Sequence, residues 1–244
     1  MQHLLRSKII HCIIILSACP FIAFSQLRYG GLNLLEHDTK PYHFGINLGM
    51  NKSHFNFTLH EQFLTQDSVT VIESINSTGI NLAWLVNFHL SEHFDFRTFP
   101  LNLTFSEKAF EYALTYPDVP AGEGKLTTKK VQSITLSLPL LIKFSSDRID
   151  NFKVYTIAGV KFDYDMAANA GKKNADDLIK LNKFDYSIEG GIGFHLYFPY
   201  FVLSPELKVS WGLTNLHSRN PDLKYSNNID KINSRMISFS LTFE

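Results

Sequence analysis

The chain has 244 residues with 23 basic and 23 acidic side chains, so its formal charge is zero and a nucleic-acid partner is not indicated. Aromatic residues make up 14% of the chain and charged residues only 19%, against about 25% charged residues in an ordinary soluble domain. Both cysteines, Cys12 and Cys19, lie near the N-terminus, which excludes a disulfide scaffold and cysteine chemistry for the rest of the chain.

Residues 1–25 predict a secretory signal peptide. Arg6 and Lys8 precede the mostly apolar stretch Ile9–Leu16, which is far shorter than the roughly 20 residues of a membrane-spanning helix. Small residues follow, and Ala23-Phe24-Ser25 matches a cleavage site. We therefore expect the mature chain to begin at Gln26.

A lipoprotein signal competes with this interpretation. Leu16-Ser17-Ala18-Cys19 matches a lipoprotein box, and processing there would leave Cys19 lipidated. The site at Ala23–Ser25 has the better distance from the basic region, and Pro20 directly after Cys19 is unfavourable. Ordinary cleavage is the preferred prediction.

Residues 26–41 are polar and predict a periplasmic lead-in, and residues 42–244 predict one domain built from strands. Apolar and polar residues alternate along each predicted strand, as in a wall with one apolar face. The phase of alternation slips between Phe96 and Phe99, so a β-bulge is expected near Pro100, which cannot donate to a ladder. The predicted strands carry the apolar stretches Phe44–Met50, Ile80–Leu90, Phe94–Phe105, Ile134–Ile142, Val154–Tyr164, Tyr186–Phe198, Phe201–Leu213 and Ile237–Phe243.

The connections between these strands alternate in length. Short ones are expected at Ser91–His93, Ser145–Asn151 and Pro199-Tyr200. Outer-membrane barrels have long extracellular loops and short periplasmic turns, whereas a soluble lipocalin-like barrel or sandwich has no such strict alternation. The long connections are expected at Asn51–Ser77, Ser106–Val131, Ala167–Lys183 and Asn215–Ile232.

The predicted fold class is therefore all-β, a transmembrane antiparallel up-and-down β-barrel of about eight strands. Most of the strands have roughly the 9–11 residues that a tilted strand needs to cross a bilayer. Aromatic residues such as Phe94, Phe152, Tyr200 and Phe243 fall at the predicted periplasmic edge, where rings suit a membrane interface. The expected location is the outer membrane, with lipid as the surrounding partner.

The polar half of the alternation should face the lumen. An eight-stranded barrel is only wide enough for its own side chains, so these charges should pair into a plug rather than line a channel. The expected inward residues are Asn47, Asn81, Asn87, His89, Asp95, Arg97, Lys143, Lys153, Lys161, Asp163, Glu189, His195, Glu206 and Lys208.

No catalytic or ligand-binding motif accompanies this pattern. The chain lacks the nucleophile elbow, the zinc-binding HExxH helix and a phosphate-binding glycine loop, and its histidines lack metal-ligand spacing. Glu189–Gly193 is glycine-rich but lies within a strand, where it should relieve crowding. We expect no enzyme, no cofactor, no metal site and no small-molecule substrate.

Asp67-Ser68-Val69 matches a short O-glycosylation pattern of Bacteroidetes.

Three segments carry a family resemblance: Lys40-Pro41-Tyr42-His43-Phe44-Gly45, Leu138-Pro139-Leu140-Leu141-Ile142-Lys143-Phe144, and Phe24-Ser25-Gln26 at the end of the signal peptide. With these the chain resembles the PorT family of Bacteroidetes outer-membrane barrels over most of its mature length. The resemblance implies participation in the type IX secretion system, which exports proteases and gliding adhesins. It implies no catalytic residues.

Two functions remain open from the sequence. The first is a non-enzymatic assembly or accessory factor for type IX secretion, with other components of that system as partners. The second is a small surface-binding or transport barrel whose extracellular loops bind a ligand. An outer-membrane hydrolase is disfavoured because no nucleophile or carboxylate set is present.

Overall fold

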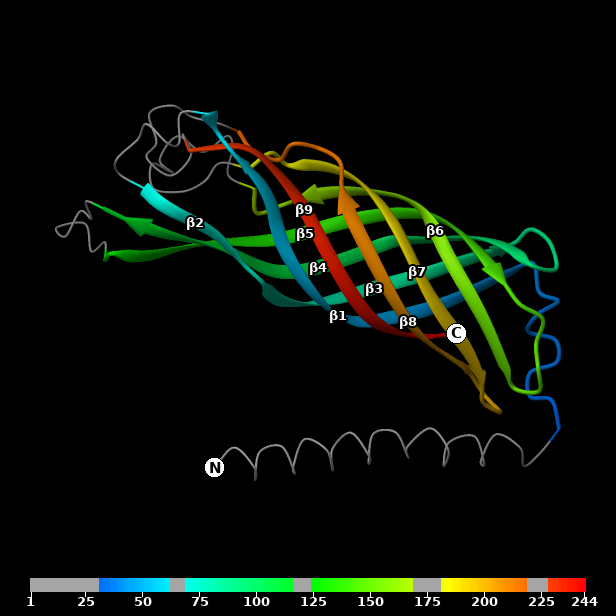
Figure 1. Cartoon of the computed structure of the whole chain (residues 1–244). Coiled ribbons are helices and arrows are strands. Elements are labelled where there is room, and N and C mark those ends of the chain that lie inside the picture. The colour runs from blue at the N-terminus through cyan, green and yellow to red at the C-terminus, as the bar shows by residue number, and fades with distance from the viewer. Residues whose placement is uncertain (1–30, 62–68, 116–123, 169–180, 219–227) are drawn as a thin grey trace, which may run out of the picture.

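The computed structural model describes residues 31–61, 69–115, 124–168, 181–218 and 228–244. The predicted signal peptide, Cys19 and Ser68 lie outside these residues. Among the described residues, no helix combines the length and apolar character needed to cross a membrane. The strands (Figure 1) are β1 (Tyr42–Leu59), β2 (Val69–Ile75), β3 (Ser77–His89), β4 (Phe94–Leu114), β5 (Leu126–Ser145), β6 (Phe152–Asp165), β7 (Phe184–Tyr197), β8 (Val202–Gly212) and β9 (Ile229–Phe243).

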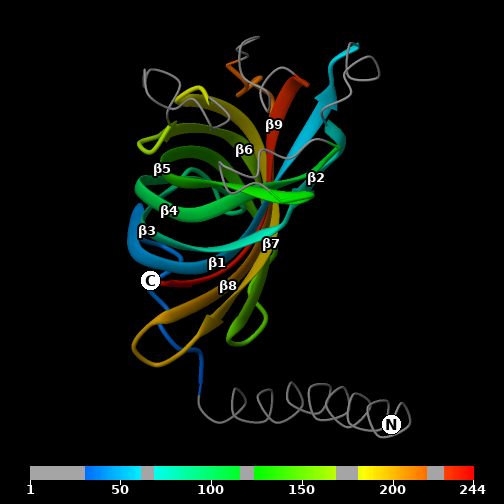
Figure 2. The ribbon, with the colours of Figure 1, turned by 90° about the vertical axis from the view of Figure 1, so that its left-hand side faces the viewer.

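Eight of these strands close into a ring. Antiparallel pairing runs β1–β3–β4–β5–β6–β7–β8–β9 and returns to β1. The closing pair of first and last strands extends from Ile46 opposite Phe243 to Leu59 opposite Ile229. The strands curve round a common axis when viewed from the end that carries β2 (Figure 2). The predicted all-β barrel with an eight-stranded wall is confirmed.

The remaining strand, β2, continues the line of β3 beyond the wall. Only Asn76 separates the two strands, and both pair with β4, β3 up to Phe105 and β2 from Ala109 to Leu114. The last pair between β1 and β3 is Ser53 with Ser77, after which β1 stays with β9. The distal parts of β4 and β5, together with β2, form a three-stranded extension that we call the arm (Figure 1).

The arm corrects the predicted loop boundaries. The segments Asn51–Ser77 and Ser106–Val131 were expected to be loops, but β1, β2, β4 and β5 occupy much of them. At these positions the outward-facing residues are no longer regularly apolar. The predicted strands were therefore ended too early. The backbone ladder nevertheless continues, because the apolar residues there face inward instead of outward.

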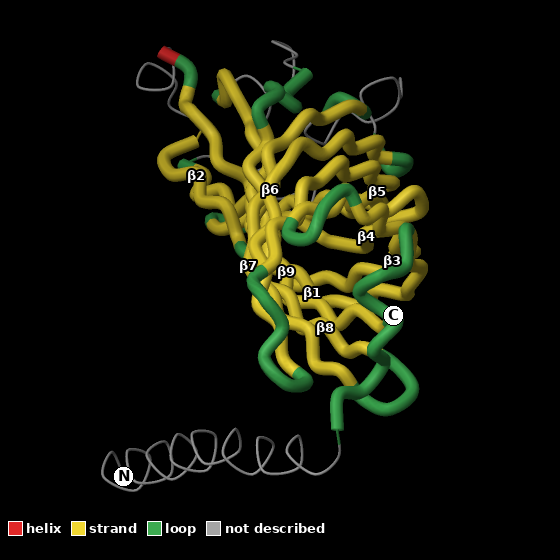
Figure 3. Tube along the Cα trace, turned by 90° about the vertical axis from the view of Figure 1, so that its right-hand side faces the viewer, coloured by secondary structure: helices red, strands yellow, loops and turns green. Residues whose placement is uncertain are grey.

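The asymmetry of the connections is confirmed in spite of these shorter loops. The turns 90–93, 146–151 and 198–201, the C-terminus and the start of β1 lie at one end (Figure 3). The strand ends that border the longer connections, at residues 59, 69, 114, 126, 165, 184, 212 and 229, lie at the other end. In an outer-membrane barrel the first end is periplasmic and the second extracellular.

The wall between the two ends has an apolar exterior. Leu48, Trp84 and Phe239 are 50%, 54% and 52% exposed, whereas Ser240 and Thr242 are buried on the inner face. A soluble protein does not expose apolar side chains around its whole circumference, so this exterior is the surface that meets lipid. The predicted orientation of the last strand is confirmed.

The bulge expected near Pro100 is present. The register between β4 and β5 shifts between Thr98 and Asn102, and the register between β3 and β4 shifts between Trp84 and Val86. The irregularity turns Phe99 into the lumen, where its side chain is fully buried. The slip in the apolar–polar alternation thus marks the point where the residues of β4 that face the lumen change from one set of alternate positions to the other.

Close contacts with neighbouring strands and side chains explain the glycines in the glycine-rich stretch of β7. A Cβ on Gly191 would lie 2.5 Å from the carbonyl oxygen of Leu207, and one on Gly193 would lie 2.6 Å from the ring of Tyr155. The missing side chain at position 193 therefore leaves room for a tyrosine inside the lumen.

Candidate functional site

The centre of the lumen is built around Arg97 of β4. Its guanidinium forms an ion pair with Glu206 of β8 and donates to Glu244 Oε1 at 3.1 Å, and all three side chains are almost completely buried. The Tyr155 hydroxyl of β6 donates to Glu206 Oε1 at 2.7 Å. Arg97 and Glu206 together thus link β4, β6 and β8 to the C-terminal residue across the barrel.

A row of ion pairs leads from this centre toward the extracellular end. Lys208 Nζ lies 3.5 Å from Glu206 and 4.0 Å from Glu189. Lys161 Nζ lies 3.9 Å from Glu189 and 3.1 Å from Asp163. Cations and anions alternate along this row. Each buried charge therefore has a neighbour of opposite charge, which offsets the cost of removing it from water.

A third group lies toward the periplasmic end. Lys143 Nζ is 2.6 Å from Asp95 and 3.2 Å from His195 Nε2. Asp95 also contacts His89, and His195 Nδ1 lies 2.6 Å from the Ser204 hydroxyl. These side chains close the bore below Arg97.

All fourteen residues expected on the inward face are found there. Most of them are buried, and His89, Lys153 and Asp163 are partly exposed but paired. The expected pairing into a plug is confirmed by the ion pairs. The uncharged members Asn47, Asn81 and Asn87 hydrogen-bond Thr242, Asn51 and Arg97 respectively.

Several lumen residues were missed by the sequence analysis. Lys108 and Asp185 are buried inside the barrel, but Lys108 lay in a predicted loop and Asp185 preceded the predicted start of its strand. Glu244 was not among the expected inward residues, although its carboxylate reaches Arg97. Lys108 and Asp185 would have been found by extending the series of alternate, inward-facing positions past the last lipid-facing residue of each strand.

Among the described residues near the extracellular end of the lumen, two small cavities measure about 40 and 30 Å³. Both are lined by Lys108, Thr135, Asp163 and Ser234, and Lys108 Nζ donates to the Ser234 hydroxyl at 3.0 Å. Sites for small-molecule ligands measure roughly 300–1,000 Å³. These cavities have the size of a few water molecules and not of a substrate.

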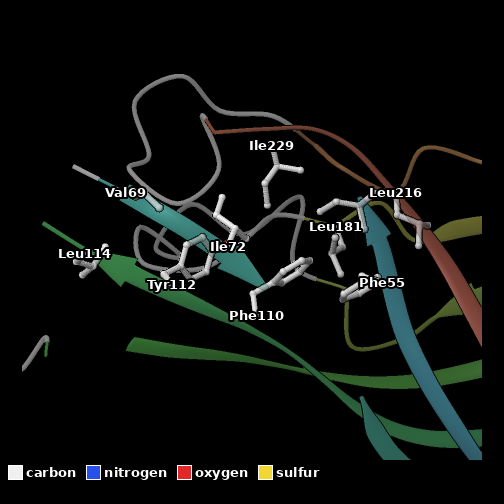
Figure 4. Close-up of a cluster of buried hydrophobic side chains, with 10 residues drawn as sticks. Phe55, Val69, Ile72, Phe110, Tyr112, Leu114, Leu181, Leu216 and Ile229 are labelled. Carbon is white, nitrogen blue, oxygen red and sulfur yellow. The ribbon is translucent and has the colours of Figure 1, made fainter. Parts of the chain in front are cut away.

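An apolar cap covers these cavities at the extracellular end (Figure 4). Phe55 stacks on Phe110 with ring centroids 5.2 Å apart, and Lys108 Nζ lies 4.7 Å from the centroid of the Phe55 ring. The cap joins β1, β2, β4 and β9 to two loop residues. Its buried members are Phe55, Val69, Ile72, Phe110, Tyr112, Leu114, Leu181, Leu216, Ile229 and Ile232.

The opposite, periplasmic mouth is covered by residues 31–41, which we call the strap. Asp38 accepts a hydrogen bond from the Tyr197 hydroxyl at 2.8 Å and lies 3.3 Å from Arg148 and 3.4 Å from Lys153. Asn33 donates to the carbonyl of Tyr197 at 3.0 Å and accepts from Arg148. The strap is thereby fixed to β6, β7 and the turn between β5 and β6.

The electrostatics of the strap match its docked position. Burial opposes ionisation of Asp38, but the Tyr197 hydroxyl, Lys153 and Arg148 outweigh it and lower the pKa of the carboxyl. Burial lowers the pKa of His37, whose ring stacks on His43 at 4.0 Å between centroids. The docked strap therefore favours an ionised Asp38 and a neutral His37.

Within the described parts of the chain, no three His, Cys, Asp or Glu side chains are placed to hold a metal ion. The candidate site is thus a filled lumen with a cap at one end and a strap at the other.

Comparison with known proteins agrees with this architecture. A family model described as "Outer membrane protein beta-barrel domain" matches residues 24–218. The comparison with curated protein sequences found no match.

Solved structures of outer-membrane proteins are similar at low identity. Neisserial surface protein A is 9% identical, with 83% of this chain and 98% of that chain covered and a TM-score of 0.40. OprG from Pseudomonas aeruginosa is 10% identical, with 82% and 94% covered and a TM-score of 0.42. The N-terminal barrel domain of OprF from Pseudomonas aeruginosa is 11% identical, with 80% and 96% covered and a TM-score of 0.31.

Proposed function

The chain belongs to the outer membrane protein β-barrel family and lies in the outer membrane, and from this premise we propose that it is a non-enzymatic assembly or accessory factor for the type IX secretion system. The choice of secretion system rests on the resemblance of Lys40–Gly45 and Leu138–Phe144 to the PorT family. In this role the barrel is a membrane-embedded scaffold, and its partners are other components of the system.

The filled lumen is the observation that carries the scaffold role. The ion pairs around Arg97 occupy the centre of the bore, and the described residues above and below it form the cap and the strap. A transport barrel needs a water-filled path, whereas a scaffold needs only a rigid wall and accessible ends. The packing favours the scaffold.

Deletion of the gene tests the proposal. Export of type IX cargo proteins into the medium should stop, while unrelated outer-membrane proteins stay at normal abundance and the membrane keeps its barrier to detergent. Normal cargo export in the deletion strain would contradict the proposal.

Complementation separates a scaffold from a conduit. A chain carrying Arg97→Met, Glu206→Gln and Glu244→Gln keeps the approximate volumes of the three side chains and removes their charges. If it folds, it should restore export, because a scaffold moves no ion through its lumen. Folded protein without export would favour a transport role instead.

The arm favours the alternative of a surface-binding barrel. Strands β2, β4 and β5 place a three-stranded sheet beyond the lipid-facing wall, where an external ligand can reach it. Removing all of Ser106–Val131 would not test this function, since Phe110 and Tyr112 belong to the cap. Replacing residues 116–123 by a shorter linker is the appropriate change, and full activity of that variant would exclude a ligand bound by this segment.

A further inference from the structure

The outward face of β1 and β9 changes from apolar to cationic at one level. On β1 the exposed Leu48 and Met50 are followed at the next outward position by the exposed Lys52. On β9 the exposed Phe239 and Ile237 are followed in the same way by the exposed Arg235. Two outward positions are about 7 Å apart along a strand, so both cations lie directly above the lipid-facing surface.

The register of the closing strand pair gathers the basic side chains. His54 is the direct cross-strand partner of Arg235, and Lys52 is the partner of Ile237, which places Lys52 diagonally next to Arg235. Lys231, opposite Thr58, lies on the same face further from the membrane. We call Lys52, His54, Lys231 and Arg235 the basic patch.

Among the residues that the structure describes, no carboxylate forms an ion pair with the basic patch. Lys52, Lys231 and Arg235 take part in none of the ion pairs found there. Inside the lumen, by contrast, Arg97, Lys143, Lys161 and Lys208 pair with carboxylates. Basic residues placed side by side across strands repel one another, and an external anion relieves that repulsion. On β4 the corresponding outward residue is the acidic Glu107, so the positive charge is local to β1 and β9.

An aromatic side chain places the patch at the membrane interface. Trp211 of β8 is the cross-strand partner of Arg235, and its side chain is 44% exposed. Tryptophan prefers the boundary between hydrocarbon and head groups. The guanidinium and the Lys52 ammonium therefore lie at the depth of lipid phosphates, and a guanidinium fork matches a phosphate in geometry as well as charge.

We propose that the basic patch on β1 and β9 is a binding site for the phosphate groups of an anionic glycolipid of the lipid A type in the outer leaflet. Lys52 and Arg235 provide the main contacts, Lys231 adds charge further out, and the acyl chains lie along Met50, Ile237 and Phe239. The site holds a lipid at the seam where the first and last strands close the barrel.

Folded mature protein in phosphatidylcholine nanodiscs provides the test, with increasing amounts of bisphosphorylated lipid A. Binding is followed by fluorescence of Trp211 in a Trp84→Phe background, and stability by the temperature of the heat-modifiable gel shift. Lipid A should change the emission saturably and raise the transition temperature. Each basic residue contributes roughly fivefold to binding, so the double change Lys52→Gln and Arg235→Gln should weaken binding about 25-fold.

Matched controls separate a phosphate site from general attraction. Lys125→Gln removes an exposed cation on the same side of the membrane but at the end of the arm, and it should bind lipid A like the wild type. Dephosphorylated lipid A should lose the specific effect. If the double variant does not fold, the single change Lys52→Gln should still weaken binding about fivefold.

Three results would overturn the proposal. They are equal affinity of the wild type and the folded variants, equal binding of dephosphorylated lipid A, and equal protection by millimolar inorganic phosphate, which would assign the site to free phosphate rather than to lipid.

Discussion

At the scale of single residues, the two faces of each strand meet different solvents. Phe239 is 52% exposed on the lipid side, and its neighbour Ser238 is 4% exposed on the lumen side. Adjacent residues in one strand therefore differ in which substitutions they tolerate.

The change Phe239→Arg tests the lipid-facing side. An arginine on the lipid face costs about 2–4 kcal/mol at the bilayer midplane and less near an interface. Ser238→Asn avoids that cost but must fit among packed side chains. In the heat-modifiable gel shift, the arginine variant should lose folded barrel or unfold at lower temperature than the asparagine variant. The reverse order would mean that the faces are assigned wrongly.

Removal of Arg97 tests the lumen. Arg97→Ala removes the buried ion pairs to Glu206 and Glu244 and leaves Lys208, at 3.5 Å, as the cation beside Glu206. Breaking a buried pair costs about 3–5 kcal/mol. Arg97→Met combined with Glu206→Gln and Glu244→Gln removes all three charges and should retain most of the stability. Urea unfolding in detergent micelles would measure both variants. Equal losses in the two would contradict a paired, desolvated network.

At the scale of elements, the strap depends on ionisation. Both Asp38 and His37 have lowered pKa values when the strap is docked, so proton binding favours the undocked strap. Docking should be complete above the ordinary histidine pKa of about 6.5, weaken below it as His37 is protonated, and be lost below about 4 as Asp38 is protonated.

A spin label can follow this transition. The expected mature chain contains no cysteine, and Glu36 is exposed within the strap, so Glu36→Cys gives a single labelling position. The label should be immobile at pH 7.5 and become mobile on acidification. With Asp38→Asn it should already be mobile at pH 7.5. A label that stays immobile in this variant would show that Asp38 does not hold the strap.

The elements also show what the sequence could predict. Strands such as β6 and β7 were placed within two residues, because a lipid face and a polar lumen impose strict alternation on them. The distal parts of β1 and β4 were missed because Phe55 and Phe110 continue these strands with the apolar side turned inward, which reverses the hydrophobic pattern. The strap contacts were beyond prediction, because they join Asn33 and Asp38 to residues more than a hundred positions away.

At the scale of the whole molecule, the barrel has two interiors. The lumen within the membrane is charged and paired, and the lumen beyond it is apolar and packed like the core of a soluble protein. The exterior changes in the opposite sense, from Met50 to Lys52 on β1. The barrel thus has a polar interior where its exterior meets lipid, and an apolar interior where its exterior meets water.

The cap should therefore contribute stability that insertion does not require. Phe110→Ala removes a fully buried ring, and such changes cost about 3–5 kcal/mol in protein cores. The variant should still insert and show the gel shift, while hydrogen exchange rises in the distal parts of β1, β4 and β9. Failure of insertion, or unchanged exchange, would contradict an independently packed cap.

The strap also fixes an order of events in time. Its anchors Arg148, Lys153 and Tyr197 come from the second half of the chain, and Asp38 is separated from Tyr197 by 159 positions. The N-terminal segment leaves the inner membrane first during export, yet its docking place exists only after β6 and β7 have paired. The first part of the mature chain to arrive is consequently the last to settle, and until then the periplasmic mouth stays accessible to any factor that handles the unfinished barrel.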